Sequence, residues 1–319
     1  MQAVIIAGGK GSRLRPFTLK QPKPLIPLLE VPFLQWLVER CAAAGLTDIL
    51  VNVGYLGSHI EAFLGSGSQF GVQIRYIREE SPLDTAGSML LAKPYYTGEP
   101  LVVFNADILT ALSLPALMEF HCCQQALHGA VATLTLTRVE DVTAYGLVEA
   151  TPSGQIVAFR EKPSPEEAKT ITTNTINAGT YVLDPQIFDP YPVGDPLSFE
   201  RQVFPELLRQ GAYLSAYVDT SYWRDLGTPH SYYQGQLDIL TQRMPDFPLP
   251  DHEQPQPGVW IHTTAETHPG ACLNAPCYVG SYCRLGSQAH ISPGTILGSH
   301  SWVNGRVLPG VYAPGTLVV

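Results

Sequence analysis

Residues of one kind recur at every sixth position after residue 258. The first series is aliphatic or β-branched and consists of Ile261, Thr267, Leu273, Val279, Leu285, Ile291, Leu297 and Val303. A second series, four places later in each unit, is small or β-branched: Ala265, Ala271, Cys277, Cys283, Ala289, Thr295, Ser301 and Val307. A period of six fits neither a helix nor an ordinary strand, but it fits a parallel β-helix whose coils have three flat sides. The pattern therefore predicts a short parallel β-helix over residues 259–319, about two and a half coils long.

The cysteines raise the alternative of a metal site in this repeat. Cys272, Cys277 and Cys283 lie close together in the sequence, but zinc sites usually contain a CxxC-type pair and these residues form none. Cys277 and Cys283 instead fall on the small-residue position of the repeat, so we predict that they are structural and buried. Six cysteines in 319 residues do not make a disulfide framework, which favours a reducing, cytoplasmic setting.

Strand-like and helix-like segments alternate before the repeat, up to about residue 242. Strands are expected at residues 3–7, 49–53, 72–77, 101–105 and 130–137, and helices from residue 33, at 115–126 and at 228–242. These strands are apolar throughout, which is typical of a parallel sheet covered on both faces. Shorter, more alternating segments at residues 147–150, 156–159 and 180–183 predict an added mixed or antiparallel region.

The domain organisation follows from these two rhythms. We expect an α/β domain over residues 1–243, a linker over residues 244–258 and the β-helix over residues 259–319. The linker is expected because five prolines and several polar residues stand between the two patterns.

The overall charge and hydropathy exclude some classes of function. A net charge of −9 argues against broad nucleic-acid binding, which needs a basic face. No stretch of eighteen uninterrupted apolar residues occurs, so no membrane span is expected. The first residues lack the charged start and cleavage site of a signal peptide. We expect a cytoplasmic protein without nucleic-acid or membrane partners.

A glycine-rich loop with five cations follows the first expected strand. The glycines are Gly8, Gly9 and Gly11, and the cations are Lys10, Arg13, Arg15, Lys20 and Lys23, with no acidic residue among them. Backbone N–H groups in such a loop can surround phosphate oxygens. The loop is neither a P-loop, because GxxxxGK[ST] is absent, nor a Rossmann fingerprint, because Leu14 replaces the third glycine. The cations indicate a ligand with more negative charge than one diphosphate.

The stretch GGKGSRLRPFTLKQPKPLIP resembles the signature GGxGxRLxPxTxxxPKPL of the sugar-phosphate nucleotidyltransferases. The resemblance continues through LDTAGSM, FNAD, YGLVE, FREKP, INAGTYVL, FERQVFPEL and YWRDLGTP. It implies a Rossmann-like mixed sheet and a reaction in which a nucleoside triphosphate and a sugar 1-phosphate give an NDP-sugar and pyrophosphate. The PKPL and FERQVFP segments are most similar to the mannose-1-phosphate guanylyltransferase branch, which uses GTP and makes GDP-mannose. The repeat likewise resembles the left-handed hexapeptide-repeat β-helix.

The resemblance implies roles for the charged residues and glycines. Gly8, Gly9 and Gly11 would surround the triphosphate, Arg13 would stabilise the transition state, and Lys23 would hold the α- and β-phosphates. Lys162 would bind the phosphate of the sugar. Asp107 and Asp225 would hold Mg²⁺, which prefers few protein ligands and keeps waters or phosphate oxygens.

Sugar and base contacts are implied in the same way. Glu161 and Asn177 could bind sugar hydroxyls, and Tyr145 and Gly146 would let the backbone approach the sugar. Thr85, Ala86 and Gly87 would form a close backbone surface for the base. Two positions depart from the pattern of many relatives, since Ala106 precedes the metal aspartate and Asp84 stands in LDTAG where glycine is common. The Asp84 carboxylate could favour the donor edge of guanine, or it could point to solvent.

Three alternatives remain open at this point. The donor and sugar could differ, as in a glucose-1-phosphate uridylyl- or thymidylyltransferase, because base readout depends on pocket geometry. A non-catalytic sugar-nucleotide-binding subunit would be favoured by loss of Arg13, Lys23, Lys162, Asp107 or Asp225, and all five are present. An acyltransferase using His290 or His300 would need a longer β-helix. The open ends of a short repeat stack predict homo-oligomerisation through it.

Overall fold

The computed structural model describes residues 1–141, 145–161, 173–249 and 251–319. These residues form two compact units. The first comprises Met1–Pro24 and Leu37–Trp223, and the second comprises Leu25–Trp36 and Arg224–Val319. The predicted boundary at residue 243 does not coincide with the boundaries of these two units.

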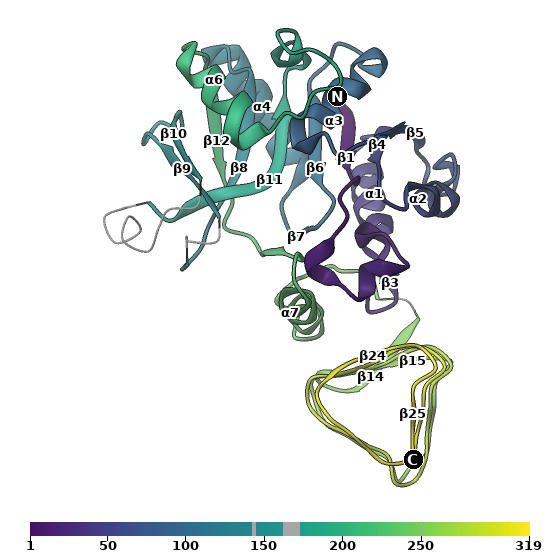
Figure 1. Cartoon of the computed structure of the whole chain (residues 1–319). Coiled ribbons are helices and arrows are strands. Elements are labelled where there is room, and N and C mark those ends of the chain that lie inside the picture. The colour runs from purple at the N-terminus through teal and green to yellow at the C-terminus, as the bar shows by residue number, and fades with distance from the viewer. Residues whose placement is uncertain (142–144, 162–172, 250) are drawn as a thin grey trace. The chain divides into compact units, whose positions relative to one another are not determined.

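A parallel sheet forms the centre of the first unit (Figure 1). Its strands are β1 (Gln2–Ile6), β4 (Asp48–Val53), β5 (Gln73–Arg78) and β6 (Leu101–Asn105), in the order β6-β1-β4-β5. The strand centres are fully buried, for example at Val4, Leu50 and Val103. This arrangement confirms the parallel sheet that the apolar runs predicted, with strand ends within about two residues of the expected ones.

Antiparallel strands extend the sheet beyond β6. Three of them, β9 (Gly146–Ala150), β10 (Ile156–Glu161) and β11 (Thr175–Leu183), were predicted by the alternating segments. The fourth, β8 (Ala132–Arg138), was expected in the parallel sheet from its apolar run, but it pairs antiparallel with β11 and so belongs to the mixed region. β11 joins the two regions because it pairs antiparallel with β6, β8 and β9. A further strand, β12 (Leu214–Val218), pairs parallel with β8, so the whole sheet is mixed.

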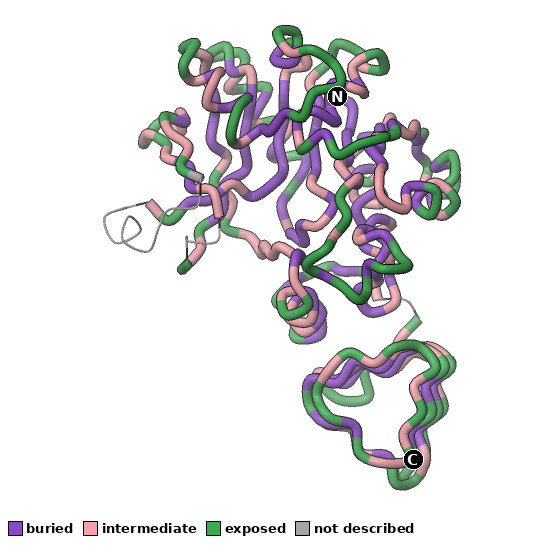
Figure 2. Tube along the Cα trace, in the orientation of Figure 1, coloured by how far each residue is buried: buried purple, intermediate pink, exposed green. Residues whose placement is uncertain are grey.

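The helices cover both faces of this sheet. Figure 2 shows the resulting burial pattern, in which the strands are buried and the outer faces of the helices are exposed. They are α1 (Phe33–Ala43), α2 (Gly57–Leu64), α3 (Asp84–Ala92), α4 (Leu114–His128) and α6 (Phe204–Arg209), preceded by the π-helix η7 (Phe199–Val203). The expected helices at 33 and 115 correspond to α1 and α4. α4 begins after the N-cap Ser113, with proline in its first turn, and ends at Gly129, whose positive φ suits glycine. No helix among the described residues is long and apolar enough to cross a membrane.

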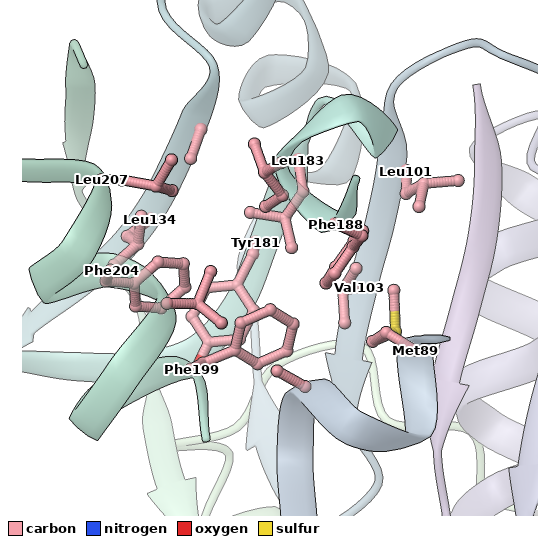
Figure 3. Packing of buried hydrophobic residues seen from close by; sticks show 14 of the residues in the cluster. Met89, Leu101, Val103, Leu134, Tyr181, Leu183, Phe188, Phe199, Phe204 and Leu207 are labelled. Atoms are coloured by element: carbon pink, nitrogen blue, oxygen red, sulfur yellow. The ribbon is translucent and has the colours of Figure 1, made fainter. Parts of the chain in front are cut away.

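An aromatic cluster fixes η7 against the sheet (Figure 3). The rings of Phe199 and Phe204 stack at 5.1 Å, and Tyr181 on β11 lies 5.5 Å from each of them. Phe188 closes the cluster at 6.0 Å from Phe199. Because all four side chains are fully buried, the cluster gives the residues around Phe199 a defined position.

Short parallel strands are stacked in three ladders in the second unit. The first ladder is β15 (Val259–His262), β18 (Cys277–Val279), β21 (Thr295–Leu297) and β24 (Gly310–Tyr312). The second is β16 (Glu266–Thr267), β19 (Arg284–Leu285), β22 (Trp302–Val303) and β25 (Leu317–Val318), and the third is β17 (Cys272–Leu273), β20 (His290–Ile291) and β23 (Arg306–Val307). Figure 1 shows these coils end-on as a triangle. We call β15–β25 the strand stack.

The later residues of the six-residue period point into the strand stack, whereas Thr267 near its start is exposed. Val279, Leu285, Ile291, Leu297 and Val303 are all at most 3% exposed. The small-position cysteines Cys277 and Cys283 are fully buried, and burial raises the pKa of the Cys277 thiol to about 12. All six cysteines of the chain are free, as the absence of a disulfide framework predicted.

Two further elements of the second unit pack on the strand stack. α7 (Pro229–Leu240) begins at Thr228 with a reciprocal cap to Ser231, as its Thr-Pro start predicted, and the indole of Trp260 donates to the Leu240 carbonyl at 3.0 Å. β14 (His252–Gln256) pairs antiparallel with β15. The expected linker therefore contains a strand, which tolerates its proline because β14 is the edge strand of its ladder.

Candidate active site

A cavity of about 610 Å³ lies at the carboxyl ends of β1, β4 and β5. It is lined by the segments that follow these strands and by the start of α3: Ile6, Gly8, Gly9, Lys10, Gly54, Tyr55, Glu79, Glu80, Ser81, Pro82, Asp84 and Thr85. Open α/β sheets bind their ligands at this edge. The glycine loop that the sequence singled out therefore lies where a ligand is expected.

A smaller cavity of about 210 Å³ shares Ile6, Gly9 and Thr85 with the larger one. Lys23, Asn105 and Asp107 complete its polar lining. The ammonium of Lys23 donates to the Asp107 carboxylate, and their side chains are 13% and 28% exposed. The structure thus brings together a predicted phosphate ligand and a predicted metal ligand.

Close chain approach explains the glycines of the loop. A Cβ on Gly8 would lie 2.7 Å from a carboxylate oxygen of Glu79. Gly11 has φ of 57°, in the left-handed region, and its carbonyl accepts a hydrogen bond from Thr18 at 2.9 Å. The loop can therefore bring its backbone N–H groups close to a ligand without side chains between them.

The other cations of the loop are exposed. Lys10, Arg13, Arg15 and Lys20 have exposed side chains, and none of them takes part in an ion pair among the residues that the structure describes. Lys10 lines the larger cavity. Lys10 at the larger cavity and Lys23 at the smaller one each offer a cation to a polyanion.

Glu79, which the sequence analysis did not single out, brings a carboxylate to the larger cavity. Burial raises its pKa, and a backbone hydrogen bond from Leu83 at 3.4 Å opposes that rise. Glu79 forms no ion pair among the described residues. Its place after the strand expected at residues 72–77 was the signal that could have identified it, because strand ends carry ligand contacts.

Asp84, the unusual residue of LDTAG, has a different environment. Its carboxylate pairs with Arg201 and accepts a hydrogen bond from the Thr85 backbone at 2.8 Å. Asp84 has φ of 61° and is the first residue of α3, so its carboxylate lies in the first turn of that helix. Of the three carboxylates at this cavity, Asp84 is therefore neutralised by a guanidinium, whereas Glu79 and Glu80 form no ion pair among the described residues.

The predicted base-binding residues Thr85, Ala86 and Gly87 form the start of α3. Thr85 lines both cavities. The backbone N–H groups of Ala86 and Gly87 donate to the Leu197 carbonyl at 2.8 and 2.9 Å. A Cβ on Gly87 would lie 2.8 Å from the Asp195 carbonyl oxygen. Ala86 and Gly87 thus fix α3 against this segment, and neither lines the two cavities.

Glu200 on η7 forms a polar cluster that the sequence analysis did not find. Its carboxylate accepts hydrogen bonds from Ser198 at 3.1 Å, Asn177 at 3.3 Å, and Thr85 and Tyr181 at 3.4 Å. Asn177 also donates to the Tyr181 hydroxyl at 2.7 Å. Burial raises the pKa of Tyr181, and the neighbouring Glu200 charge raises it further. The cluster joins predicted base and sugar residues in one network.

The other predicted sugar residues lie on adjacent strands. Gly146 on β9 is paired with Glu161 on β10, and β9 is also paired with β11, which carries Asn177. The ring of Tyr145 meets that of Trp223 edge-on at 5.6 Å. The structure therefore brings these strands together, although the side chain of Glu161 lies outside its description.

Comparison with known proteins identifies the family. The family model described as Nucleotidyl transferase matches residues 2–242, which is more than half of the chain. The chain belongs to the nucleotidyl transferase family. This confirms the family that the glycine loop and the seven further motifs indicated.

Three relatives show the range within the family. The chain is similar to mannose-1-phosphate guanylyltransferase of Mycobacterium tuberculosis, with 39% identity over 298 residues covering 93% of this chain and 78% of the relative. It is 31% identical over 312 residues to UTP–glucose-1-phosphate uridylyltransferase of Synechocystis, covering 93% and 78%. A solved structure described as a glucose-1-phosphate thymidylyltransferase of Bacillus anthracis superposes with a TM-score of 0.66 at 25% identity, covering 74% of this chain and 94% of that one.

Two further predicted residues of this nucleotidyltransferase, Lys162 and Asp225, are not among the described residues of the first unit. Lys162 falls in residues 162–172, outside the described part of the chain. Asp225 belongs to the second unit, on β13 (Trp223–Asp225). Its neighbour Arg224 donates to the buried Asp238 carboxylate at 2.8 Å, so Arg224 is held by another residue of the second unit. Among the described residues, no three His, Cys, Asp or Glu side chains group as a metal cluster.

Proposed function

We propose that this sugar-phosphate nucleotidyltransferase transfers the guanylyl group of GTP to mannose 1-phosphate, which yields GDP-mannose and pyrophosphate. The supporting observation is the Glu79 carboxylate, which lines the larger cavity without a cationic partner among the described residues. Guanine presents two adjacent N–H donors, N1–H and N2–H, which a carboxylate can accept together. Uracil and thymine present one N–H between two carbonyl oxygens. A carboxylate that accepts from this N–H would be repelled by the carbonyl oxygens on either side. The mycobacterial relative supports the same choice.

The reaction needs positioning and charge stabilisation more than a general base. An anionic phosphate oxygen of the sugar phosphate attacks the α-phosphorus, and the bond to pyrophosphate breaks. Gly8, Gly9 and Gly11 surround the triphosphate with N–H donors, and Lys23 and Arg13 offset its charge. Lys162 holds the phosphate of the sugar. Bringing two polyanions together is the main barrier that these groups lower.

Mg²⁺ is the cofactor that we propose for Asp107 and Asp225. Asp107 fits this role because its carboxylate lines the smaller cavity beside Lys23. Carboxylate oxygens are the hard donors that Mg²⁺ prefers, and two of them leave room for phosphate oxygens. When bound, the ion would neutralise phosphate charge. Asp225 is proposed as the second carboxylate because it belongs to the motif YWRDLGTP.

The sugar is proposed to lie along β9, β10 and β11. Asn177 and Glu161 would bind its hydroxyls, and Gly146 would let the backbone approach closely. Asn177 is held ready for this role because its amide donates to Tyr181 and Glu200, while its carbonyl accepts from the Gly179 N–H at 3.1 Å. Tyr145 would form the wall of the sugar site, supported by Trp223.

The strand stack is proposed to be a left-handed β-helix through which copies of the chain associate. Trp302 and Leu317 are neighbours on its second ladder and are 40% and 67% exposed. Sedimentation velocity of the full chain and of Trp302→Glu tests this association; a wild-type monomer would contradict it.

The family match ends at residue 242, which supports the proposed domain boundary at 243. The free cysteines support a cytoplasmic location.

Pyrophosphate release tests the proposed reaction. The full chain is incubated with Mg²⁺ and a grid of nucleoside triphosphates and sugar 1-phosphates, with Lys162→Ala as control. The expected result is strongest release with GTP and mannose 1-phosphate, lost in the variant. Strongest release with UTP or dTTP and glucose 1-phosphate would favour the activity of the other relatives. Nucleotide binding without any release would favour a regulatory subunit.

A further inference from the structure

The Glu200 carboxylate on η7 connects two parts of the first unit. Its Oε1 oxygen accepts hydrogen bonds from the Asn177 amide at 3.3 Å and the Tyr181 hydroxyl at 3.4 Å. Its Oε2 oxygen accepts from the Ser198 hydroxyl at 3.1 Å and the Thr85 hydroxyl at 3.4 Å. One oxygen therefore holds β11, which carries a proposed sugar ligand, and the other holds the start of α3, which lines both cavities.

The surroundings of Asn177 define which way its side-chain amide faces. Its NH₂ group donates to the Tyr181 hydroxyl at 2.7 Å and to Glu200, and its carbonyl oxygen accepts from the Gly179 N–H at 3.1 Å. A reversed amide would bring the carbonyl oxygen against the Glu200 carboxylate and the NH₂ group against the Gly179 N–H. Since both N–H groups of the amide are used, Asn177 can offer a substrate only a lone pair of its carbonyl oxygen.

An irregularity in β11 brings this amide close to the smaller cavity. The pairing of β11 with β8 changes register between Asn177 and Tyr181. Gly179 lies inside this stretch with φ of 77°, and a Cβ there would lie 2.9 Å from the side-chain nitrogen of Asn105. Asn105 lines the smaller cavity. Bulges in strands re-aim side chains and are common beside active sites, so the stretch that holds Asn177 packs against a wall of the site.

The position of Glu200 itself is fixed by packing. Its neighbour Phe199 is fully buried in the aromatic cluster, and the Phe199 N–H donates to the Thr85 hydroxyl at 3.0 Å. The element that carries both residues, η7, is a π-helix, and such turns occur frequently at functional sites. Because the aromatic cluster holds η7 in place, the Glu200 carboxylate is in position before a substrate binds.

We propose that Glu200 is a positioning residue that fixes the amide of Asn177 as a hydrogen-bond acceptor for the sugar. The inference rests on the proposed role of Asn177 in binding a sugar hydroxyl, and Glu200 itself is not a ligand of the substrate. Without this carboxylate the amide loses a contact that opposes its reversal, and a reversed amide would present N–H groups to the sugar. A displacement of about 1 Å in a group that positions substrate can lower the rate by about 10²-fold.

Steady-state kinetics of the full chain compare Glu200→Ala and Glu200→Gln with wild type. The assay uses the nucleoside triphosphate and sugar 1-phosphate that give the strongest pyrophosphate release. We expect Glu200→Ala to lower kcat/KM for the sugar phosphate about 10- to 100-fold. The KM for the nucleotide should change little, because the Phe199 N–H still holds Thr85. Glu200→Gln keeps a carbonyl oxygen that accepts from Asn177 and should recover most of the rate.

A double-mutant cycle separates positioning from a merely structural role. If Glu200 acts through Asn177, then Glu200→Ala should lower kcat/KM by less than about threefold in the Asn177→Ala background. Equal losses in both backgrounds would overturn the inference, because they would show that the two residues act independently. Glu206→Ala is the matched control, since it removes a surface carboxylate on the next helix that pairs with Arg209, and it should match wild type.

Hydrogen exchange of the Gly179 amide gives a readout that does not depend on turnover. This N–H is bonded to the Asn177 carbonyl, so it should exchange at least about tenfold faster in Glu200→Ala than in wild type, and Glu206→Ala should not show this change. Asn177→Ala supplies the reference for complete loss of the hydrogen bond. Unchanged Gly179 exchange in Glu200→Ala would overturn the inference. An inactive wild type would count against the proposed reaction alone, and the exchange result would then decide the inference by itself.

Discussion

Lys23 donates a hydrogen bond from its ammonium to the carboxylate of Asp107, and the two side chains share the smaller cavity. In the proposed reaction these residues have different partners, because Lys23 binds phosphate and Asp107 binds Mg²⁺. Their ion pair therefore neutralises both groups. When the triphosphate binds with Mg²⁺, this ion pair would be replaced by two others, Lys23 with phosphate and Asp107 with Mg²⁺, at similar net charge.

Asp107→Asn tests this exchange of partners. The substitution removes a metal ligand, so we expect kcat to fall by roughly 10²–10³-fold. Because Lys23 is then freed from a carboxylate, triphosphate binding without Mg²⁺ should become tighter, not weaker. Steady-state kinetics and fluorescence titration with a labelled GTP measure the two effects.

The matched control is Asp189→Asn, which breaks another Lys–Asp pair, with Lys93, on the surface. It should change neither quantity. Weaker metal-free binding in Asp107→Asn would contradict the proposed role of Lys23.

Glu79→Gln tests the proposed readout of the base. An amide can accept only one of the two guanine N–H groups and presents a donor to the other, so the affinity for GTP should fall about 10- to 100-fold. The affinity for UTP should stay the same or rise, because the repulsion from its carbonyl groups is relieved. Competition binding measures the two affinities. Glu80→Gln, at the exposed neighbour that also lines the cavity, is the control; equal effects of both substitutions would contradict the assignment.

Most of the strands could be predicted from the sequence, but the side-chain contacts between distant residues of the site could not. β1, β4, β5 and β6 could be predicted because apolar runs buried on both faces carry their own signal. The period of six similarly predicted the strand stack, but ladders of four, four and three strands make it longer than the two and a half coils expected. By contrast, Lys23 and Asp107 are 84 residues apart, and no local pattern indicates that they form a pair.

The start of α3 and the position of Glu200 show why the rest of the site could not be predicted. α3 was not among the expected helices, and its first turn is held by the Leu197 carbonyl, which is distant in sequence. Glu200 occurs in FERQVFP, but its place depends on the aromatic cluster that packs Phe199 beside it. Tertiary contacts decide both features, so sequence periodicity does not show them.

Gly87→Ala should destabilise the chain even though alanine is the better helix former. A helical Gly→Ala change ordinarily stabilises by about 1 kcal/mol. Here the new Cβ would lie 2.8 Å from the Asp195 carbonyl oxygen and 3.0 Å from the Leu197 nitrogen, and backbone atoms cannot move aside easily. We expect a net loss of about 1–3 kcal/mol in the free energy of unfolding. Urea denaturation measures this, and unchanged or greater stability would show that the segment is not packed as described.

His121 should make stability depend on pH. It is fully buried on α4, and its Nδ1 lies 2.9 Å from the hydroxyl of Thr133. Burial lowers its pKa to about 4, below the value of about 6.5 in an unfolded chain. The unfolded state therefore binds the proton more readily. The contribution is fully present above about pH 6.5 and is lost as the pH falls towards 4.

Substitution of His121 by Asn tests this pH dependence. Asn can replace the hydrogen bond of Nδ1 but does not titrate, so the loss of stability between pH 6.5 and 4.5 should be smaller by about 2 kcal/mol than in wild type. Urea unfolding at the two pH values measures it. His128→Asn, at an exposed residue of the same helix, should leave the loss unchanged. The same loss in wild type and His121→Asn would contradict the prediction.

The choice of substrate is the central claim, and a competition assay tests it most directly. The full chain is given GTP, UTP, dTTP and ATP together at equal concentrations with Mg²⁺ and mannose 1-phosphate, and the nucleotide sugars are quantified by mass spectrometry. The account predicts that GDP-mannose exceeds every other product by at least about tenfold, as expected for a site that pairs with the donor edge of guanine. A mixture without preference, or an excess of the UDP- or dTDP-sugar, would contradict it.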